Sequence, residues 1–215
     1  MATYTKGDQS REEIVKRSRE IFNEHGIHLT FSNLVHYLDT TMGRITYHFR
    51  NKELLFVAIV KEYEKELMEM RMQRQSDQIG FDQFIQSVAR VMDLQFEYRC
   101  ALRYVISSLQ HQDDMKMHLV EAYKNNRTSI YKTMQTYVDA GSLHPKVLND
   151  DTYEVFLFQI TNLFTTWVIN LELYDSNRPY AEVKPIYLRG MIATFLPFLT
   201  EKGKRELHSS GLYQS

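Results

Sequence analysis

Polar side chains that can read double-stranded DNA lie close together in the N-terminal region. Arg44 can pair bidentately with guanine O6 and N7, and Thr41 can contact a thymine methyl group. Tyr47 and His48 continue this polar side and would reach sugar or phosphate groups. These four residues can act together only if one helix presents them on the face opposite Ile45, which would be turned inward.

Two further residues, Thr30 and Lys52, stand where helices are expected to begin. Helix N-termini point free backbone amides outward, and these amides bind phosphate groups. An ordinary solvated surface position would also explain any one of the six residues taken alone. The prediction of DNA contacts therefore depends on the elements that would bring all six together.

Three short helices are expected in the first fifty residues. The Ser-Arg-Glu-Glu segment at 10–13 has the pattern of a capping box, which predicts a helix start, and Gly26 predicts its left-handed end. Thr30 and Thr41 are N-cap candidates for the next two helices, with a turn of about three residues after Leu38 between them. This is the layout of a helix-turn-helix, in which one helix braces and the next enters a groove.

Longer helices are expected in the rest of the chain. Asn51 is the N-cap candidate of a fourth helix, and others are expected over 81–99, 114–140, 151–174 and 180–202. Segments with glycine or proline separate them, and no alternating run of β-branched residues indicates a strand. The sequence therefore predicts an all-α protein with a small N-terminal module and a large helical body, divided near residue 52.

The N-terminal module resembles the DNA-binding signature of the TetR/AcrR family of transcriptional regulators. The matching segments are 26–30 (GIHLT), 33–35 (NLV), 43–49 (GRITYHF) and 51–55 (NKELL). The His-Phe pair followed three residues later by Lys-Glu and two leucines is the most specific part. Asp39 stands where the family usually has glycine in the turn. Thr46 stands where it usually has tyrosine, and Tyr47 follows one position later.

This resemblance implies a ligand-responsive, dimeric DNA-binding transcriptional regulator. It would be a repressor that a small-molecule effector releases from a palindromic double-stranded DNA operator. The implied organisation is a helix-turn-helix DNA-binding domain over residues 1–52 and a helical effector-binding and dimerisation domain over residues 53–215.

The helical body is rich in aromatic residues, which have two interpretations. They can form a packed helical core, or part of them can line an apolar pocket for a small ligand between helices. The family resemblance favours an effector pocket, and its candidate lining residues are Phe96, Tyr104, Tyr123, Phe164 and Trp167.

The last two expected helices carry apolar residues on more than one face. A helix that is apolar nearly all round must be buried on all sides, which predicts a partner surface and a C2 homodimer. The resemblance implies that this helix pair forms a four-helix bundle with a second copy. The candidate interface residues are Phe156, Ile160, Leu163, Ile192 and Phe195.

Other classes of function find little support in the sequence. The single cysteine, Cys100, excludes an internal disulfide framework and a multi-cysteine zinc module. Neither Glu-x-x-His nor His-Glu-x-x-His occurs, so we expect no metal, no cofactor and no enzymatic activity. The longest uncharged run, 155–171, contains six Gln, Thr or Asn residues and is read as a buried helix. A cytoplasmic protein without a membrane segment is expected.

The charge balance keeps two alternatives open. The first fifty residues carry seven Lys or Arg and six Asp or Glu, so they form no basic stripe of the kind common in DNA-binding proteins. One alternative is a helical small-molecule-binding or enzymatic protein whose N-terminal module does not bind DNA. The other is a family member that has lost specific DNA binding, which Thr46 would also fit.

Overall fold

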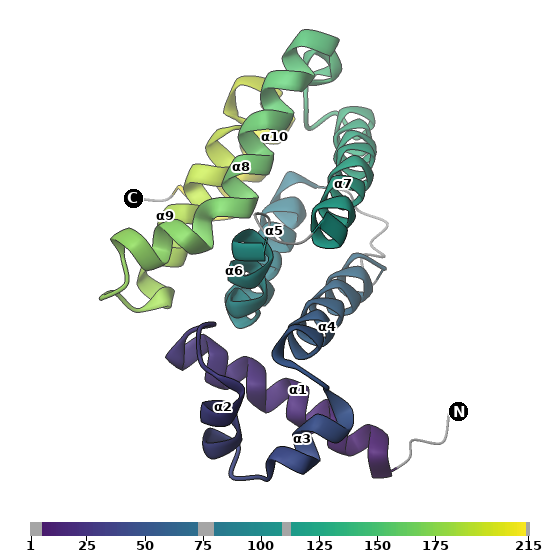
Figure 1. The fold of residues 1–215 in the computed structure, drawn as a ribbon. Helices are drawn as coiled ribbons and strands as arrows, with labels where there is room; N and C mark the ends of the chain where they lie inside the picture. The colour runs from purple at the N-terminus through teal and green to yellow at the C-terminus, as the bar shows by residue number, and fades with distance from the viewer. Residues whose placement is uncertain (1–5, 73–79, 109–112, 214–215) are drawn as a thin grey trace. The chain divides into compact units, whose positions relative to one another are not determined.

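The computed structural model describes residues 6–72, 80–108 and 113–213, without the side chains of 6–9, 113–120, 122 and 123. These residues form helices and connecting turns, with one isolated bridge between Leu143 and Leu199. The prediction of an all-α protein is confirmed (Figure 1). The helices are α1 (Lys6–His25), α2 (Phe31–Tyr37), α3 (Met42–His48), α4 (Lys52–Met72), α5 (Phe81–Glu97), α6 (Arg99–Ser108), α7 (Asp113–Asp139), η1 (Pro145–Leu148), α8 (Asp150–Tyr174), α9 (Tyr180–Ala193), η2 (Leu196–Phe198) and α10 (Glu201–Ser209).

Packing divides the described residues into two compact units. The first unit consists of the described residues within 1–74 and 94–111, namely α1 to α4, the last turn of α5, and α6. The second takes those within 75–93 and 112–215, namely the rest of α5 and α7 to α10. By packing, α4 and α6 thus join the three N-terminal helices. The predicted boundary at residue 52 separates a DNA-binding domain from an effector-binding domain by function, not by packing, and it stays a prediction.

Aromatic stacking holds the first unit together. The Phe56 ring lies between Phe22 of α1, at a centroid distance of 4.4 Å, and Tyr104 of α6, at 4.2 Å. All three side chains are buried. Because these rings come from α1, α4 and α6, the contact fixes α4 between the N-terminal helices and α6.

The core of the second unit is an aromatic cluster around Phe195, which is 1% exposed. Its ring lies 4.9 Å from that of Phe84, 5.1 Å from Phe156 and 5.6 Å from Phe81, measured between centroids. Aromatic pairs at these separations contribute beyond the area they bury. The cluster thereby joins α5, α8 and the segment after α9.

Two differences from the expected helices have clear causes. The helix expected over 180–202 ends at Ala193, and Pro197 then lies in η2, because proline lacks the amide that a continuing helix would need. The first helix already begins at Lys6, so Ser10 is not its N-cap. The end at Gly26 is confirmed by its φ of +93°. Asn51 caps α4 as predicted, because its side chain accepts a 2.9 Å hydrogen bond from the amide of Leu54.

Candidate nucleic-acid interface

The helix-turn-helix is built on local capping. At the start of α2, the Thr30 hydroxyl accepts a hydrogen bond from the amide of Asn33 at 3.1 Å, and the Asn33 side chain accepts one from the amide of Thr30 at 3.3 Å. After α2, Asp39 adopts a φ of +48°. Aspartate thus takes the left-handed conformation at the position where glycine is usual in the family that the sequence resembles.

The third helix is anchored on one side and exposed on the other. Thr41 caps it by accepting a 3.3 Å hydrogen bond from the amide of Arg44. Ile45 is fully buried, and Phe49 follows it into the core with the Arg11 guanidinium 5.0 Å from its ring centroid. The opposite side of α3 is exposed and consists of Met42, Gly43, Arg44, Thr46 and Tyr47.

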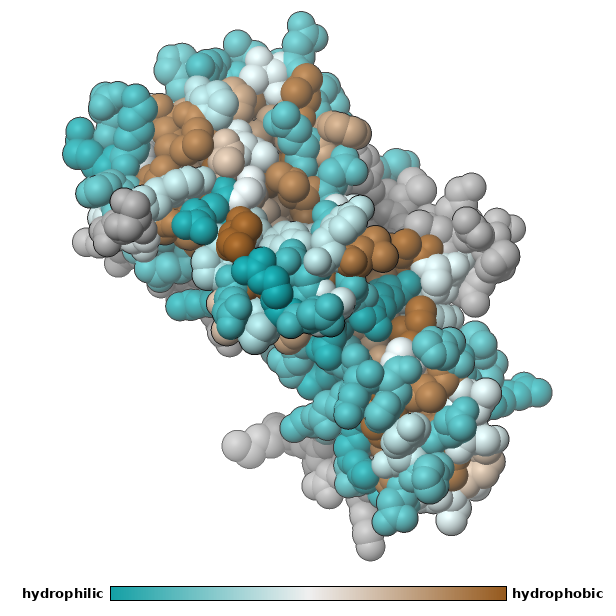
Figure 2. All heavy atoms as spheres, turned by 90° about the vertical axis from the view of Figure 1, so that its left-hand side faces the viewer, coloured by the Kyte–Doolittle hydropathy of each residue, from teal (hydrophilic) through white to brown (hydrophobic). Residues whose placement is uncertain are grey.

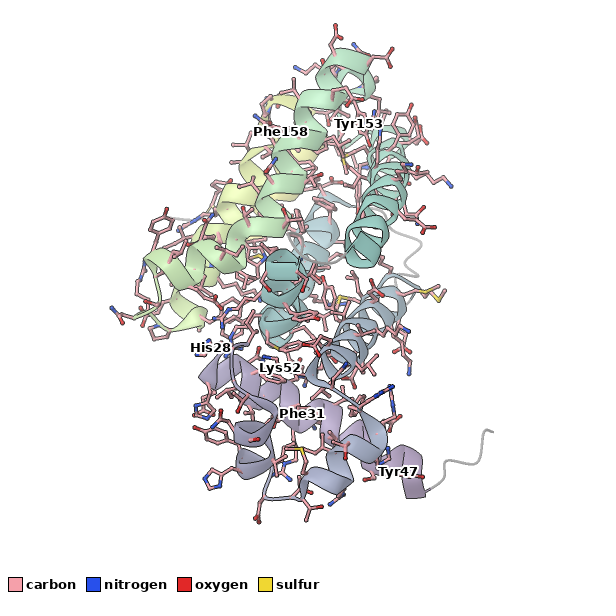
Figure 3. The ribbon with its side chains drawn as sticks, viewed as in Figure 1. His28, Phe31, Tyr47, Lys52, Tyr153 and Phe158 are labelled. Atoms are coloured by element: carbon pink, nitrogen blue, oxygen red, sulfur yellow. The ribbon has the colours of Figure 1, made fainter. Side chains whose placement is uncertain are left out.

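Tyr47 is the most exposed large side chain of this helix, at 83% (Figure 3). Its ring meets that of His48 edge-on at 4.9 Å, and His48 is partly buried. The hydroxyl of Thr46 donates to the Met42 carbonyl at 2.9 Å. Thr46 is therefore satisfied within the helix, whereas the Tyr47 hydroxyl extends beyond the helix surface.

Arg44 is held by α1. Its Nη2 lies 3.3 Å from Glu13 Oε2 and 3.2 Å from Ser10 Oγ, and its Nε lies 3.4 Å from the same Ser10 oxygen. Both charged side chains remain about half exposed, at 51% for Arg44 and 55% for Glu13. Sequence reasoning missed these partners because it assigned Ser10 and Glu13 to a capping box. The same spacing of three residues also places two side chains one helical turn apart on a single face.

Lys52 is engaged inside the first unit. Its ammonium donates to the carbonyls of Ile27 and Leu29, each at 3.1 Å. These carbonyls belong to the connection between α1 and α2. The side chain therefore fastens the start of α4 to that connection, and it is not directed freely outward as a phosphate contact would require.

The six predicted DNA-contacting residues all lie in the first unit. Thr30 and Thr41 are N-caps, Arg44 and Tyr47 are exposed on α3, His48 is partly buried, and Lys52 binds backbone carbonyls. The list thus separates into residues on the exposed face of α3 and residues that shape the module. An exposed helix after a braced turn, with a half-exposed arginine in its first turn, has the form that enters a major groove. Contact with DNA stays a prediction for each of them.

The predicted pocket residues are divided between the two units. Tyr104 and Phe96 belong to the first, where the Phe96 ring lies under the Arg99 guanidinium at 4.6 Å. Phe164 and Trp167 belong to the second, where buried Trp167 packs 6.0 Å from Tyr180. The side chain of Tyr123 lies outside the described residues. Trp167 therefore serves as a core residue of the second unit.

Four predicted dimer-interface residues are covered by their own chain. Phe156, Ile160, Ile192 and Phe195 are each at most 4% exposed. They pack in the core of the second unit and present no surface to a partner, so their assignment to an interface is corrected. Leu163 is partly exposed. These helices do carry apolar residues on more than one face, as predicted. The sequence pattern alone does not tell which of these faces is buried within the chain and which is left exposed.

Comparison with known proteins decides the family. A family model described as "Bacterial transcriptional repressor" matches residues 62–207, and one described as "Bacterial regulatory proteins, tetR family" matches residues 14–59. The chain belongs to the TetR family. Its N-terminal module is the helix-turn-helix of a TetR-family transcriptional regulator, and its larger remainder is helical. A search of curated proteins gave no significant match.

Solved structures share this TetR fold over nearly the whole chain. A TetR-family regulator from Marinobacter aquaeolei VT8 is 23% identical, with complete coverage of both chains and a TM-score of 0.78. A gamma-butyrolactone receptor described as ArpA-like is 15% identical over 97% of this chain and 96% of its own, with a TM-score of 0.64. The SmeT–triclosan complex is 14% identical over 90% and 93%, with a TM-score of 0.59.

The TetR chain exposes an apolar stripe on α8 that sequence reasoning did not select. Val155 is 60% and Phe158 69% exposed. Tyr153, two residues before Val155, instead turns inward and donates to the Arg127 carbonyl of α7 at 2.8 Å (Figure 3). The signal for the outward stripe was the second apolar face already visible in the sequence.

Two further properties concern the described part of this TetR chain. It contains no group of three or more His, Cys, Asp or Glu side chains placed to hold a metal ion. None of its helices has both the length and the apolar character needed to cross a membrane.

Proposed function

We propose that this TetR-family protein is a dimeric repressor that binds a pseudo-palindromic DNA operator and leaves it when a small molecule binds. The observation that carries the proposal is the exposed side of α3, with Arg44 in its first turn and Tyr47 beyond it, held on buried Ile45. A face that served only to stabilise the fold would have no reason to keep an 83% exposed tyrosine there. Base edges in a major groove match these side chains.

The proposed dimer uses the outer face of α8 and α9. Besides Val155 and Phe158, this face contains Thr165 and Thr166. Their hydroxyls donate hydrogen bonds of 2.8 and 2.7 Å to backbone carbonyls one turn earlier in the same helix. Because those hydroxyls are already satisfied, the threonines can enter an interface at little cost in hydrogen bonds. Figure 2 shows apolar side chains among polar ones on the side where α8 and α9 lie.

Helix α9 contributes a matching stripe. Its exposed positions recur every three or four residues and include small and apolar side chains, namely Ile186, Gly190, Ala193 and, just beyond, Leu196. Small residues allow close approach of a second helix, and the apolar ones would lose their contact with water. An isologous C2 contact would bury both stripes at once.

Two buried polar atoms beside α4 support effector binding. Glu62 Oε2 and the Tyr104 hydroxyl are both buried without a hydrogen-bond partner among the described residues. Burial raises the pKa of Glu62, although Arg19 nearby opposes the shift. Buried polar atoms normally have partners, so a ligand that supplied a hydrogen-bonding group to either atom would gain a strong hydrogen bond. Two solved TetR-like proteins are a gamma-butyrolactone receptor and a triclosan complex.

The same helix would carry the response to the DNA-reading module. Lys52 at the start of α4 holds the connection between α1 and α2, and Glu62 lies further along α4. A ligand that displaces α4 would move this connection and with it the orientation of α3. We therefore propose a positioning role for Lys52 in place of the predicted phosphate contact. Coupling of this kind is typically about 1–3 kcal/mol and reciprocal.

Selection from a random DNA pool tests the function. The purified protein should enrich a pseudo-palindromic sequence whose half-sites lie about 34–36 Å apart or a multiple of this. Repeating the binding step with a metabolite mixture should release the enriched DNA. If no sequence is enriched and no duplex is retained in a salt-dependent way, the proposed function is wrong.

A further inference from the structure

Ser10 and Glu13 form a socket on α1 for the arginine of α3. The two side chains lie one helical turn apart, and between them they accept three hydrogen bonds from Arg44, at 3.2 to 3.4 Å. The donors are Nε and Nη2, which form one edge of the guanidinium fork. The terminal edge of the fork, Nη1 with the second hydrogen of Nη2, can therefore pair with guanine while Arg44 stays in the socket.

The socket cancels charge at the place where DNA would bind. Arg44 and Glu13 form a salt bridge whose two side chains are about half exposed, so the pair lies at the surface of the module, and Ser10 adds two hydrogen bonds that help to keep it closed. While it is closed, it offers a phosphate backbone no net positive charge. This matters here because the first fifty residues have only one more Lys or Arg than Asp or Glu. Affinity for DNA of arbitrary sequence comes mainly from neutralising phosphates.

We propose that Glu13, supported by Ser10, is a specificity-determining residue that keeps Arg44 from binding DNA of arbitrary sequence. In a loosely placed, non-specific complex, Arg44 stays paired with Glu13 and adds nothing to affinity. In the specific complex, α3 is docked in the groove, and the terminal edge of the guanidinium meets the two guanine acceptors while Glu13 and Ser10 still hold Arg44 in place. The inference rests on the proposed function, because it assumes that α3 reads DNA.

The competing interpretation is a tie between α1 and α3 that only stabilises the module. Such a tie would lower thermal stability when broken and weaken binding to every duplex alike. The proposed role instead changes the ratio between specific and non-specific binding. A readout that compares two duplexes therefore separates the two interpretations.

The test compares the Glu13→Gln variant with wild type by fluorescence anisotropy. The probes are a duplex that wild type selects from a random pool and a scrambled duplex of the same composition, each at three or more salt concentrations. Glu13→Gln should tighten binding to the scrambled duplex about three- to fivefold per subunit, the range of an exposed ion pair. The log–log salt slope on that duplex should steepen by about 0.9 for each phosphate newly contacted. Affinity for the selected duplex should change by less than about twofold, so the specificity ratio falls.

A double-mutant cycle with Arg44→Ala shows whether Glu13 acts through Arg44. If it does, Glu13→Gln should have less than half of its effect, in log affinity, when Arg44 is absent. Equal effects in both backgrounds would mean simple repulsion of DNA by Glu13 and would overturn the proposal. A lower melting temperature with weaker binding to both duplexes would also overturn it, in favour of a structural tie.

Failure of the proposed function gives a different result from failure of this inference. If wild type selects no sequence and binds neither duplex in a salt-dependent way, the function itself is refuted, and the specificity role with it. If wild type selects DNA but Glu13→Gln leaves the specificity ratio unchanged, only the role of Glu13 is refuted.

Discussion

Replacing Phe158 by aspartate should dissociate the dimer without destabilising the fold. The Phe158 side chain is 69% exposed on α8, so a partner can cover most of it. A phenylalanine buries on the order of 200 Å², and 69% of this is about 140 Å². At about 25 cal/mol per Å², each ring would contribute about 3.5 kcal/mol, and the two rings of a C2 dimer about 7 kcal/mol.

The value of about 7 kcal/mol is an upper bound. Association also costs entropy when the two subunits and their side chains become ordered, and area-based energies assume an idealised, fully solvated starting state. Even half of it, about 3.5 kcal/mol, corresponds to a factor of several hundred in the dimer dissociation constant. Aspartate would add the cost of a charge in an apolar interface. The free energy of unfolding of the monomer should change little, because most of Phe158 is already exposed to solvent in its own chain.

Sedimentation velocity over a range of concentrations measures the effect. Wild type should sediment as a dimer, and Phe158→Asp should become monomeric at concentrations where wild type does not. Met68→Asp is the matched control, since Met68 is 56% exposed but lies on α4 of the other unit. A monomeric wild type, or Phe158→Asp dimers as tight as those of wild type, would refute the assignment of this face.

Three further variants test the fold and the module around the site. Gly203→Ala should cost about 1–3 kcal/mol in chemical unfolding, because its added Cβ would overlap the Ser142 carbonyl oxygen, whereas Gly43→Ala, which meets nothing within 4 Å, should not. Lys52→Met should lower the free energy of unfolding by about 1–3 kcal/mol, because it removes the donor to two backbone carbonyls. If stability is unchanged and the log–log salt slope of DNA binding falls by about 0.9 per subunit, Lys52 contacts a phosphate instead. Burial alone would raise the pKa of Glu206, but hydrogen bonds from the Ser142 hydroxyl and the Phe81 amide, with Lys202 nearby, hold that pKa below its usual value. A lowered pKa in the folded state means that Glu206 stabilises the fold above pH 4.5, the ordinary value, and loses this as pH falls through the folded pKa. Melting curves should therefore show Glu206→Gln less stable than wild type at pH 7, with the difference shrinking on acidification; a difference independent of pH would contradict this.

Local signals made the N-terminal module predictable from sequence. Thr30, Thr41 and Asn51 all cap helices as predicted, because a cap needs only the residues within one turn of it. The left-handed positions at Gly26 and Asp39 are likewise local. These residues determine where α2 and α3 begin and end, and therefore determine the layout of the helix-turn-helix.

Partners from distant parts of the chain could not be predicted in this way. Ser10 and Glu13 have the spacing of a capping box, but α1 continues past them and both face Arg44, more than thirty residues further along the chain. On α8, Phe156 and Phe158 look equally apolar in the sequence. Only packing against Phe195 decides that Phe156 turns inward and Phe158 outward.

Binding of the Arg44→Ala variant to selected and scrambled duplexes tests the central claim most directly. Arg44 is half exposed in the first turn of α3, where its guanidinium fork suits a guanine edge. The account predicts a loss of about 1–3 kcal/mol on the selected duplex, with relaxed preference at one base pair per half-site and little change on the scrambled duplex. Equal losses on both duplexes would contradict the claim that Arg44 reads sequence. Unchanged binding to both would contradict the placement of α3 against DNA.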